Sequence, residues 1–425
     1  MKLKELLFYI VFSTFSTIVF SQEKIVAAIE IKGLKKTKNS FLKTLLLTKK
    51  GQILDSLQLE KDIIQLKRLP AISYAYYQVN HSHNNFYNVI LNIEENFTLI
   101  PEVNIWTTTN KRFSYKVGLY DYNLLGRNIT FGGFYQHNGF STYAINFKAP
   151  QLFSKKWGLA LNHQNWKSEE PLYFANNTAN YLYNNVSYEI LGLYQLNFKN
   201  QINFGINFFN EKYQYLSGAT NTTIPRSLDV DKKLLKLIYD YNGLNYFYQY
   251  IQGFKSVLYM QYVTTTNTFQ NDFFIAWNDF FYFKRFGSNA NWANRLRFGL
   301  SSNEKSPFAP FALDNNVNIR GVGILVDRGT GSFVLNSEYR YTIYDKKWLA
   351  IQTNFFTDFG SWRNPGGSFN DFFNKENIRI FSGLGFRFIS KKMYNATFRI
   401  DYGFKIFDGK NESNGGLVFG IGQYF

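Results

Sequence analysis

The sequence predicts a transmembrane β-barrel of about 16 antiparallel strands, preceded by one small α+β domain. Aromatic residues make up 20% of the 425-residue chain, with 45 Phe and 31 Tyr, yet the mean hydropathy is only −0.27. Apolar and polar residues must therefore be interleaved, and from about residue 97 onward they alternate with period two. A strand that separates lipid from a polar lumen needs this period. In the stretch before residue 97, apolar residues also recur at helical spacing.

Residues 1–21 are predicted to be a signal peptide. Lys2 and Lys4 supply a basic start, residues 6–20 form an uncharged apolar run, and Ser21 places a small residue at the cleavage position. The run is shorter than the roughly 20 residues of a spanning helix, and no later segment approaches that length. We therefore expect an exported protein that begins near Gln22 and has no transmembrane helix. An uncleaved membrane anchor is the alternative.

Residues 22–96 are predicted to fold as a separate domain with the element order β-α-α-β-β. Thr37 and Asp55 are residues of the kind that caps a helix, and Pro70 cannot continue one. The expected elements are a strand at Ile25–Ile31, a helix from Thr37 to about Leu47, a helix from Asp55 to before Pro70, and strands at Ala75–Val79 and Asn88–Ile93.

Residues 97–425 are predicted to form one closed barrel. A strand with its connection takes about 20 residues, so this length holds about 16 strands. Phe398, Ile400 and Tyr402 alternate with Arg399 and Asp401, as one example of the pattern. A secreted soluble β-protein is the alternative, but its buried face would be aliphatic, whereas the apolar face here is rich in aromatic residues. Closure follows because an open sheet edge cannot stay unpaired in lipid.

Arg320 is the main candidate functional residue, in a loop at about residues 303–331 that we expect to fold into the lumen. Glu338 lies on the polar face of one alternating stretch, and Asp358 lies on the polar face of the next. Both acids are therefore expected to face the lumen, where the loop would bring Arg320 to them. A guanidinium donates directed hydrogen bonds to two carboxylates, which a lysine cannot reproduce. The alternative is a solvated arginine in a surface loop.

Several short segments of the barrel carry a family resemblance. They are Gly118–Gly126, which includes Asn123, then Phe147–Leu152, Gly331–Arg340 and Phe355–Gly360, together with Ile319-Arg320-Gly321 and Phe425. Together they resemble the superfamily of BamA, TamA and two-partner secretion transporters, of the bacterial surface antigen type. The resemblance implies an outer-membrane barrel in which Arg320 is locked to Glu338 and Asp358. Val322 departs from the pattern, which has an aromatic residue after Arg-Gly.

The N-terminal domain resembles a POTRA domain. Ile29–Leu34 matches the opening strand followed by glycine, and Leu66–Ile72 fits the end of the second helix. The resemblance implies a periplasmic position for residues 22–96 and a short family member with a single POTRA domain.

The C-terminal stretch provides a second family signal. Leu417, Phe419, Ile421 and Phe425 alternate with small residues, among them Gly420 and Gly422. A final Phe425 resembles the signal by which outer-membrane barrels are themselves inserted. Because glycines pack weakly in a strand, we hypothesise that Gly420 and Gly422 weaken a seam between the first and last strands.

The resemblance implies an insertase or translocase of the BamA type in the outer membrane of a Gram-negative bacterium, in a specialised or accessory role. Its expected partners are unfolded client polypeptides, which would pair with the POTRA strand edge, outer-membrane lipids, and periplasmic or lipoprotein accessory subunits. One alternative is a two-partner secretion transporter, and another is a structural or pore-forming barrel. Whether protein or lipid is moved stays open.

Composition and motifs argue against other classes of function. The chain has no cysteine, and none of its four histidines lies in a metal-binding motif, so we expect no metal and no cofactor. Nucleophile-elbow and P-loop patterns are missing, which predicts that the protein is not an enzyme. The net charge of +17 is spread over polar strand faces and turns. We therefore expect contact with anionic lipid headgroups and no binding of nucleic acid.

Overall fold

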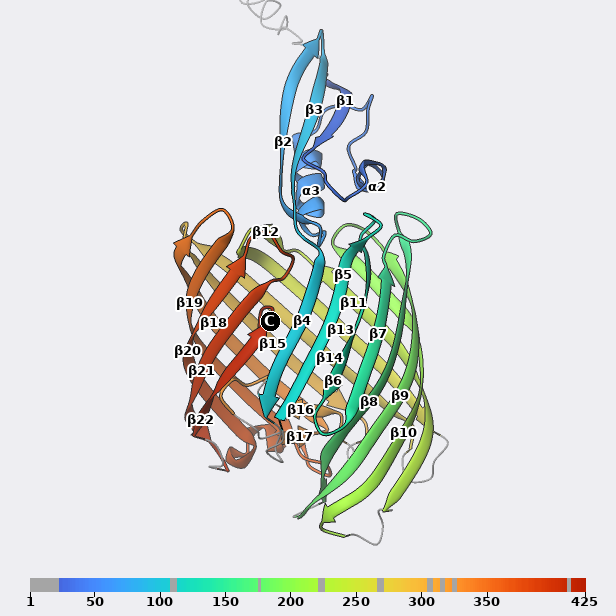
Figure 1. Cartoon of the computed structure of the whole chain (residues 1–425), viewed down its shortest axis with the longest axis vertical. Helices are drawn as coiled ribbons and strands as arrows, with labels where there is room; N and C mark the ends of the chain where they lie inside the picture. The colour runs from blue at the N-terminus through green and yellow to red at the C-terminus, as the bar shows by residue number, and fades with distance from the viewer. Residues whose placement is uncertain are drawn as a thin grey trace, which may run out of the picture.

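The computed structural model shows a small domain standing at one end of a barrel (Figure 1). It describes residues 23–107, 113–174, 177–220, 226–265, 271–303, 309–313, 318–322, 327–410 and 414–425. The expected signal peptide, residues 1–21, and parts of the loop at 303–331 lie outside the described residues. Among the described helices, none is both long and apolar enough to span a membrane.

The N-terminal domain has the predicted order of elements. These are β1 (Ile25–Lys32), α2 (Asn39–Leu45), α3 (Ser56–Lys67), β2 (Ile72–His83) and β3 (Phe86–Glu95). The sheet order is β1-β3-β2, with β1 parallel and β2 antiparallel to β3. Leu42, Leu59 and Leu66 from the helices pack into one buried cluster with Val89 and Leu91 of the central strand. This arrangement leaves β1 and β2 at the two edges of the sheet.

The two helices begin differently. Asp55 caps α3 as predicted, because its side chain accepts a hydrogen bond from the backbone N–H of Leu57 at 2.8 Å. The prediction that Thr37 caps the first helix is wrong, since the N-cap residue of α2 is Lys38 and its side chain makes no capping bond. The Thr37 hydroxyl instead accepts a hydrogen bond at 3.0 Å from Asn123 in the barrel.

The barrel consists of antiparallel strands that follow chain order around a closed ring. In the described residues the ring contains 16 long strands, the number predicted. Their bounds are β4 Leu99–Thr107, β5 Phe113–Leu124, β6 Ile129–His137, β7 Ser141–Ala149, β8 Trp157–Phe174, β9 Asn177–Gln195, β10 Asn200–Gly218, β11 Ser227–Asn242, β13 Tyr250–Thr265, β14 Phe273–Phe286, β15 Ala290–Ser301, β18 Gly331–Asp345, β19 Leu349–Arg363, β20 Ile378–Ser390, β21 Thr397–Asp408 and β22 Gly415–Ile421. The remaining elements are the short strands β12 (Asn245–Phe247), β16 (Phe311–Leu313) and β17 (Asp327–Gly329), and the 3-10 helices η1 (Phe369–Phe373) and η2 (Lys375–Asn377).

The two faces of the barrel wall differ as the alternation predicts. In β18, Tyr339 and Tyr341 are 46% and 45% exposed on the outer face, whereas Glu338 and Arg340 are fully buried on the inner face. Exposed apolar and aromatic side chains recur on the outside of the other strands, and buried charged side chains recur inside. This is the pattern of a transmembrane barrel with a polar interior.

The ring closes between β22 and β4. Figure 1 shows these first and last barrel strands side by side. With seven residues, β22 is the shortest of the long strands that complete the ring. The strand that closes the ring therefore offers fewer backbone N–H and C=O groups for pairing than the other long strands do.

Candidate functional site

The loop between β15 and β18 enters the barrel lumen. Its described residues Ile319, Arg320 and Val322 are all buried, at 0%, 0% and 1% exposure. Ile319 and Val322 belong to an apolar cluster that also contains Trp362 and Phe381 of the wall. Val322, where the family pattern has an aromatic residue, is therefore packed inside.

Arg320 contacts both acids singled out in the sequence. Its Nε and Nη2 donate to the two carboxylate oxygens of Asp358 at 2.8 and 2.9 Å, and its Nη1 donates to Glu338 at 2.5 Å. Its backbone N–H also donates to Asp358 at 2.9 Å. Aromatic rings cover the guanidinium, with Phe356 at 3.7 Å and Tyr424 at 4.4 Å from its central carbon. Charge pairing and ring stacking thus hold the same group.

Two glycines of the barrel wall let the loop tip approach. Gly321 has a φ of +92°, and a Cβ on Gly403 of β21 would lie 2.5 Å from the carbonyl oxygen of Arg320. Only two glycine backbones can pack this closely. Gly360, at the end of the Asp358 motif, makes room in the same way for the side chain of Ile319.

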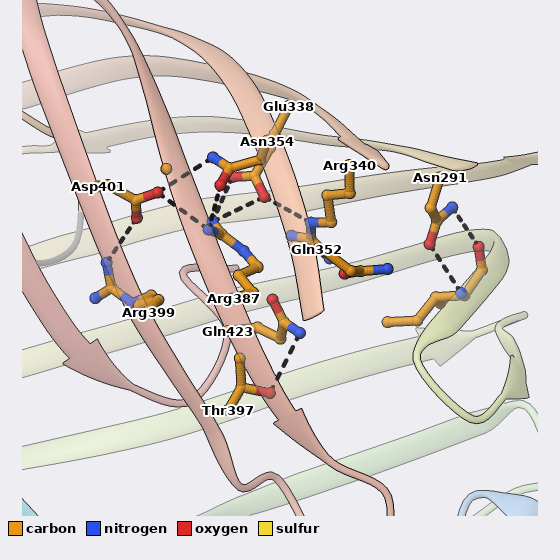
Figure 2. Close-up of polar contacts among 12 residues, drawn as sticks. Asn291, Glu338, Arg340, Gln352, Asn354, Arg387, Thr397, Arg399, Asp401 and Gln423 are labelled. Atoms are coloured by element: carbon orange, nitrogen blue, oxygen red, sulfur yellow. Dashed lines mark hydrogen bonds and ion pairs between the residues drawn. The ribbon is translucent and has the colours of Figure 1, made fainter. Parts of the chain in front are cut away.

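The arginine lock extends further than the sequence indicated (Figure 2). Glu338 also accepts hydrogen bonds from Arg340 at 2.6 Å and from Arg387 at 2.8 Å. Arg387 in turn donates to Asp401 at 3.0 Å, and Asp401 lies 3.4 Å from Arg399. We call Arg320, Glu338, Arg340, Asp358, Arg387, Arg399 and Asp401 the lumen lock. The added members sit on polar strand faces that the alternation had located, whereas nothing in the sequence pointed to Phe356 or Tyr424.

The segment Gly118–Gly126 has a different place, at the junction with the N-terminal domain. Asn123 is buried and donates to the Thr37 hydroxyl at 3.0 Å, and the carbonyl of Gly126 accepts from the Lys38 N–H at 3.0 Å. Gly126 has a φ of +69° and lies against the Lys36 backbone, so a larger residue has no room there. Gly118 lies within β5, where a Cβ would come 2.8 Å from a neighbouring strand's carbonyl. Asn123 and Gly126 thus seat the N-terminal domain on the barrel, whereas Gly118 allows close approach of β5 and β6.

A second connection folds inward across the end of the lumen that faces the N-terminal domain. We call residues 243–251 the inward turn; they include β12. Asn291 of β15 binds the turn as a strand would, since its side-chain amide pairs with both the N–H and the C=O of Ile251, at 2.9 and 2.8 Å (Figure 2). Two further bonds reach β18, from Gln249 to Asp345 and from Tyr250 to Thr342, each at 2.8 Å.

The N-terminal domain holds the inward turn from outside. Arg68 donates to the carbonyl of Leu244 at 2.8 Å and to that of Phe198, in another turn, at 2.6 Å. Tyr248 stacks on Tyr74 at 4.9 Å and donates to Glu94 at 3.3 Å. Burial and the nearby Glu94 raise the pKa of Tyr248 to about 12, so it stays a neutral donor at physiological pH.

The C-terminal residues do not form one regular strand. The last strand ends at Ile421, and Gly422, with a φ of +91°, starts a change of direction. Phe425 therefore leaves the row of outward apolar residues and lies near the guanidiniums of Arg295 and Arg340, at 5.9 and 5.7 Å. Gly420 provides space on the inner face, because a Cβ there would lie 2.6 Å from the Arg399 guanidinium.

The site has the chemistry of a structural lock. Its groups are arginines and carboxylates paired with one another, an arrangement that holds a loop in place. In the part of the chain that the structure describes, no group of three His, Cys, Asp or Glu residues could hold a metal ion.

Comparison with protein families and solved structures agrees with this architecture. The POTRA family model, described as surface antigen variable number repeat, matches residues 24–96. The structure is similar to BamA from Haemophilus ducreyi lacking POTRA domains 1–3, with a TM-score of 0.54 and 14% identity over 93% of this chain and 84% of that one. It is also similar to CdiB from Acinetobacter baumannii, with a TM-score of 0.60 and 13% identity over 94% of this chain and 73% of that one. For CdiB from Escherichia coli the TM-score is 0.61, with 11% identity over 93% of this chain and 75% of that one. Comparison with curated proteins found no match. The predicted combination of one POTRA domain and a barrel is confirmed.

Proposed function

We propose that this chain, in which a POTRA domain is joined to a barrel with the fold of BamA and CdiB, is an outer-membrane insertase or transporter of polypeptides. The observation that carries the proposal is the lumen lock. Arg320 fixes an inward-folded loop to Glu338 and Asp358 within a barrel that carries a POTRA domain at one mouth. A passive pore needs neither a locked loop nor a docked domain with open strand edges.

The POTRA domain would receive the client. Both β1 and β2 are edge strands. The start of β1 already pairs with residues 51–54, whereas the twelve residues of β2 offer backbone groups to an extended segment. Strand addition of this kind gives affinity through main-chain hydrogen bonds, with little demand on client sequence. The client would then pass to the barrel, either through the lumen or along the seam between β4 and β22.

The proposed location is the outer membrane of a Gram-negative bacterium, with the POTRA domain in the periplasm. The outward apolar faces of the strands support a membrane position, because such a surface in water would aggregate. Fractionation of the cell envelope and protease treatment of intact cells would test both parts. Recovery of the protein in the soluble fraction would contradict the proposal.

A two-partner secretion transporter is the second candidate, and one observation favours it. The TM-scores to the two CdiB structures, 0.60 and 0.61, are higher than the 0.54 to BamA. The fold therefore agrees with dedicated export as well as with insertion. A specialised or accessory insertase and a dedicated exporter differ in the number of clients.

Depletion of the protein followed by outer-membrane proteomics separates these possibilities. Loss of many barrel proteins would indicate general assembly, and loss of one surface protein would indicate dedicated export. An unchanged proteome, together with single-channel conductance of the purified protein, would contradict both and leave a pore or structural barrel. Complementation with Arg320→Ala belongs in the same experiment, since a role for the lock predicts that this variant fails to restore the lost proteins.

A further inference from the structure

A cavity of about 1190 Å³ lies where the POTRA domain meets the rim of the barrel. Its walls come from the end of β3, from the start of β4 and from the turns that follow β18 and β20. It is lined by six lysines and three carboxylates. The lysines are Lys35, Lys36, Lys346, Lys347, Lys391 and Lys392, and the carboxylates are Glu94, Glu95 and Asp345.

The carboxylates of this cavity are already engaged. Glu95 accepts the backbone N–H groups of Lys36 and Thr37 at 2.8 and 2.9 Å. Glu94 accepts from Tyr248, and Asp345 accepts from Gln249 and Lys391. Six lysines against three carboxylates leave the cavity with an excess of positive charge.

Four of the lysines have no carboxylate partner among the residues that the structure describes. They are Lys35, Lys346, Lys347 and Lys392, all exposed to the cavity or to solvent. They come from three separate connections of the chain and converge on one space. A concave site with excess positive charge attracts an anion with several acceptor oxygens, such as a phosphate group.

The cavity also has an apolar side that leads to the outside of the barrel. Phe97 and Leu99 line it and are 56% and 40% exposed. Leu99 continues along the outer face of β4 to Val103, which is paired with the exposed Val117 of β5. A ligand that fills both parts has an anionic head and an apolar tail.

The rim around the cavity has the composition of a membrane interface. Trp348 follows Lys346 and Lys347 directly and is 58% exposed. Aromatic rings and lysines placed together mark the level of lipid headgroups, with the rings in the interface and the ammonium groups in water. A soluble anion or an acidic peptide would use the lysines and leave the apolar side uncovered.

We propose that this cavity binds the phosphate-bearing headgroup of an anionic phospholipid, with its acyl chains against the outer face of β4. The inference rests on the membrane location proposed above and is independent of polypeptide transport. The lipid would lie beside the first barrel strand, at the seam, and would contact the POTRA domain through Lys35. It would thus belong to the periplasmic leaflet.

Lipid retention by the full-length protein tests the inference. The protein is placed in nanodiscs of phosphatidylcholine with a minority of phosphatidylglycerol, extracted gently, and the retained lipids are identified by native mass spectrometry. We expect phosphatidylglycerol to be enriched on the unmodified protein. In Lys346→Gln/Lys347→Gln the preference should fall about fivefold for each lysine removed, the usual weight of a lysine near an anionic surface.

The chain supplies a closely matched control. Lys155, Lys156 and Trp157 repeat the Lys-Lys-Trp sequence in the turn between β7 and β8, at the same end of the barrel but away from the cavity. Lys155→Gln/Lys156→Gln should leave the preference unchanged. An equal fall in both variants would overturn the proposal, because it would show a diffuse surface effect.

Two further measurements distinguish lipid binding from the binding of free phosphate and from misfolding. Calorimetry with inorganic phosphate in detergent examines the headgroup chemistry alone, and phosphate binding without phosphatidylglycerol enrichment would overturn the lipid assignment. Heat-dependent migration on gels reports whether each variant is a folded barrel. Failure to enter nanodiscs would count against the membrane location, whereas entry without lipid preference would count against the cavity.

Discussion

At the scale of single residues, Arg320 joins the inward-folded loop to the barrel wall. Its guanidinium is fully buried and bonded to two carboxylates, and two aromatic rings cover its faces. Burying such a group is costly, so its value lies in holding one geometry. Ile319 and Val322 hold the same loop through apolar contacts with Trp362 and Phe381.

Replacing Arg320 with alanine should destabilise the barrel by about 3–5 kcal/mol, because Glu338 and Asp358 would remain buried with less compensation. Arg320→Lys should recover only part of this loss, since an ammonium cannot bond both oxygens of Asp358 and contact Glu338 as well. Unfolding in urea, followed by heat-dependent gel migration, measures the effect. Arg127→Ala, an exposed arginine in a turn, is the control. Equal stability of Arg320→Ala and the control would contradict the lock.

Gly403→Ala tests the packing of the loop tip without touching a charge. The new methyl group would meet the Arg320 carbonyl and the Gly321 backbone, so the tip must move. Overpacking of this kind costs about 1–3 kcal/mol. Gly192→Ala is a suitable control, because its methyl group would meet only the end of the Phe204 ring at 3.2 Å. We expect increased hydrogen exchange at residues 318–322 in Gly403→Ala alone.

The strand residues of the site can be predicted from the sequence, because apolar and polar residues alternate strictly along each strand. Alternation puts Glu338 and Asp358 on the lumen side, and it does the same for Arg387 and Asp401. It cannot say which inward residues from different strands meet, because that depends on register and on the path of the loop. The alternation does not predict a role for Phe356, because an aromatic residue on a polar face looks like an exception to the pattern. It does not predict one for Tyr424 either, because Tyr424 follows the last strand.

At the scale of elements, the inward turn is a second connection that enters the lumen, at the mouth that faces the POTRA domain. It is held by Asn291 inside the barrel and by Arg68 from the POTRA domain. Periodicity gave no indication of it, since residues 243–251 mix aromatic and amide residues without a clear face. The POTRA elements were easier to predict, because Asp55 and Pro70 mark helix ends locally, although tertiary contact with the barrel overrode the capping role expected for Thr37.

Asn291→Ala should release the inward turn and raise the conductance of the barrel in planar bilayers. The change leaves the N–H and C=O of Ile251 without their partner, at a cost of about 1–3 kcal/mol. Asn294→Ala, in the same strand, removes an amide with a single hydrogen bond of 3.4 Å and serves as control. Unchanged conductance in Asn291→Ala would show that the turn does not limit flow through the mouth.

At the scale of the whole molecule, the central question is whether the ring opens between β4 and β22. The shortness of β22 supports the hypothesis of a weak seam. The hypothesis that Gly420 and Gly422 cause it stays a prediction, although the structure offers other roles for both. Gly420 leaves space for Arg399, and Gly422 turns the chain inward.

Engineered disulfides across the seam test its opening directly, and the chain has no native cysteine to interfere. Cysteines are placed in Leu99–Val103 and in Leu417–Ile421, and pairs that form a confirmed cross-link are assayed for restoration of the client proteins. Loss of function that a reductant reverses is the expected result. Val117→Cys/Tyr135→Cys joins two strands away from the seam and should remain active. Full activity under a complete seam cross-link would exclude obligatory opening.

The lumen lock also determines how the barrel can deform. Apart from Arg320 in the loop, its acids and arginines come from β18, β19, β20 and β21, which are consecutive in the ring. Ion pairs between adjacent strands make that part of the wall stiff. A change in the cross-section is then taken up by strands outside this set. Its neighbours in the ring are β15 on one side and β22, followed by β4, on the other. The seam between β22 and β4 thus begins one strand away from the part of the wall that the ion pairs stiffen.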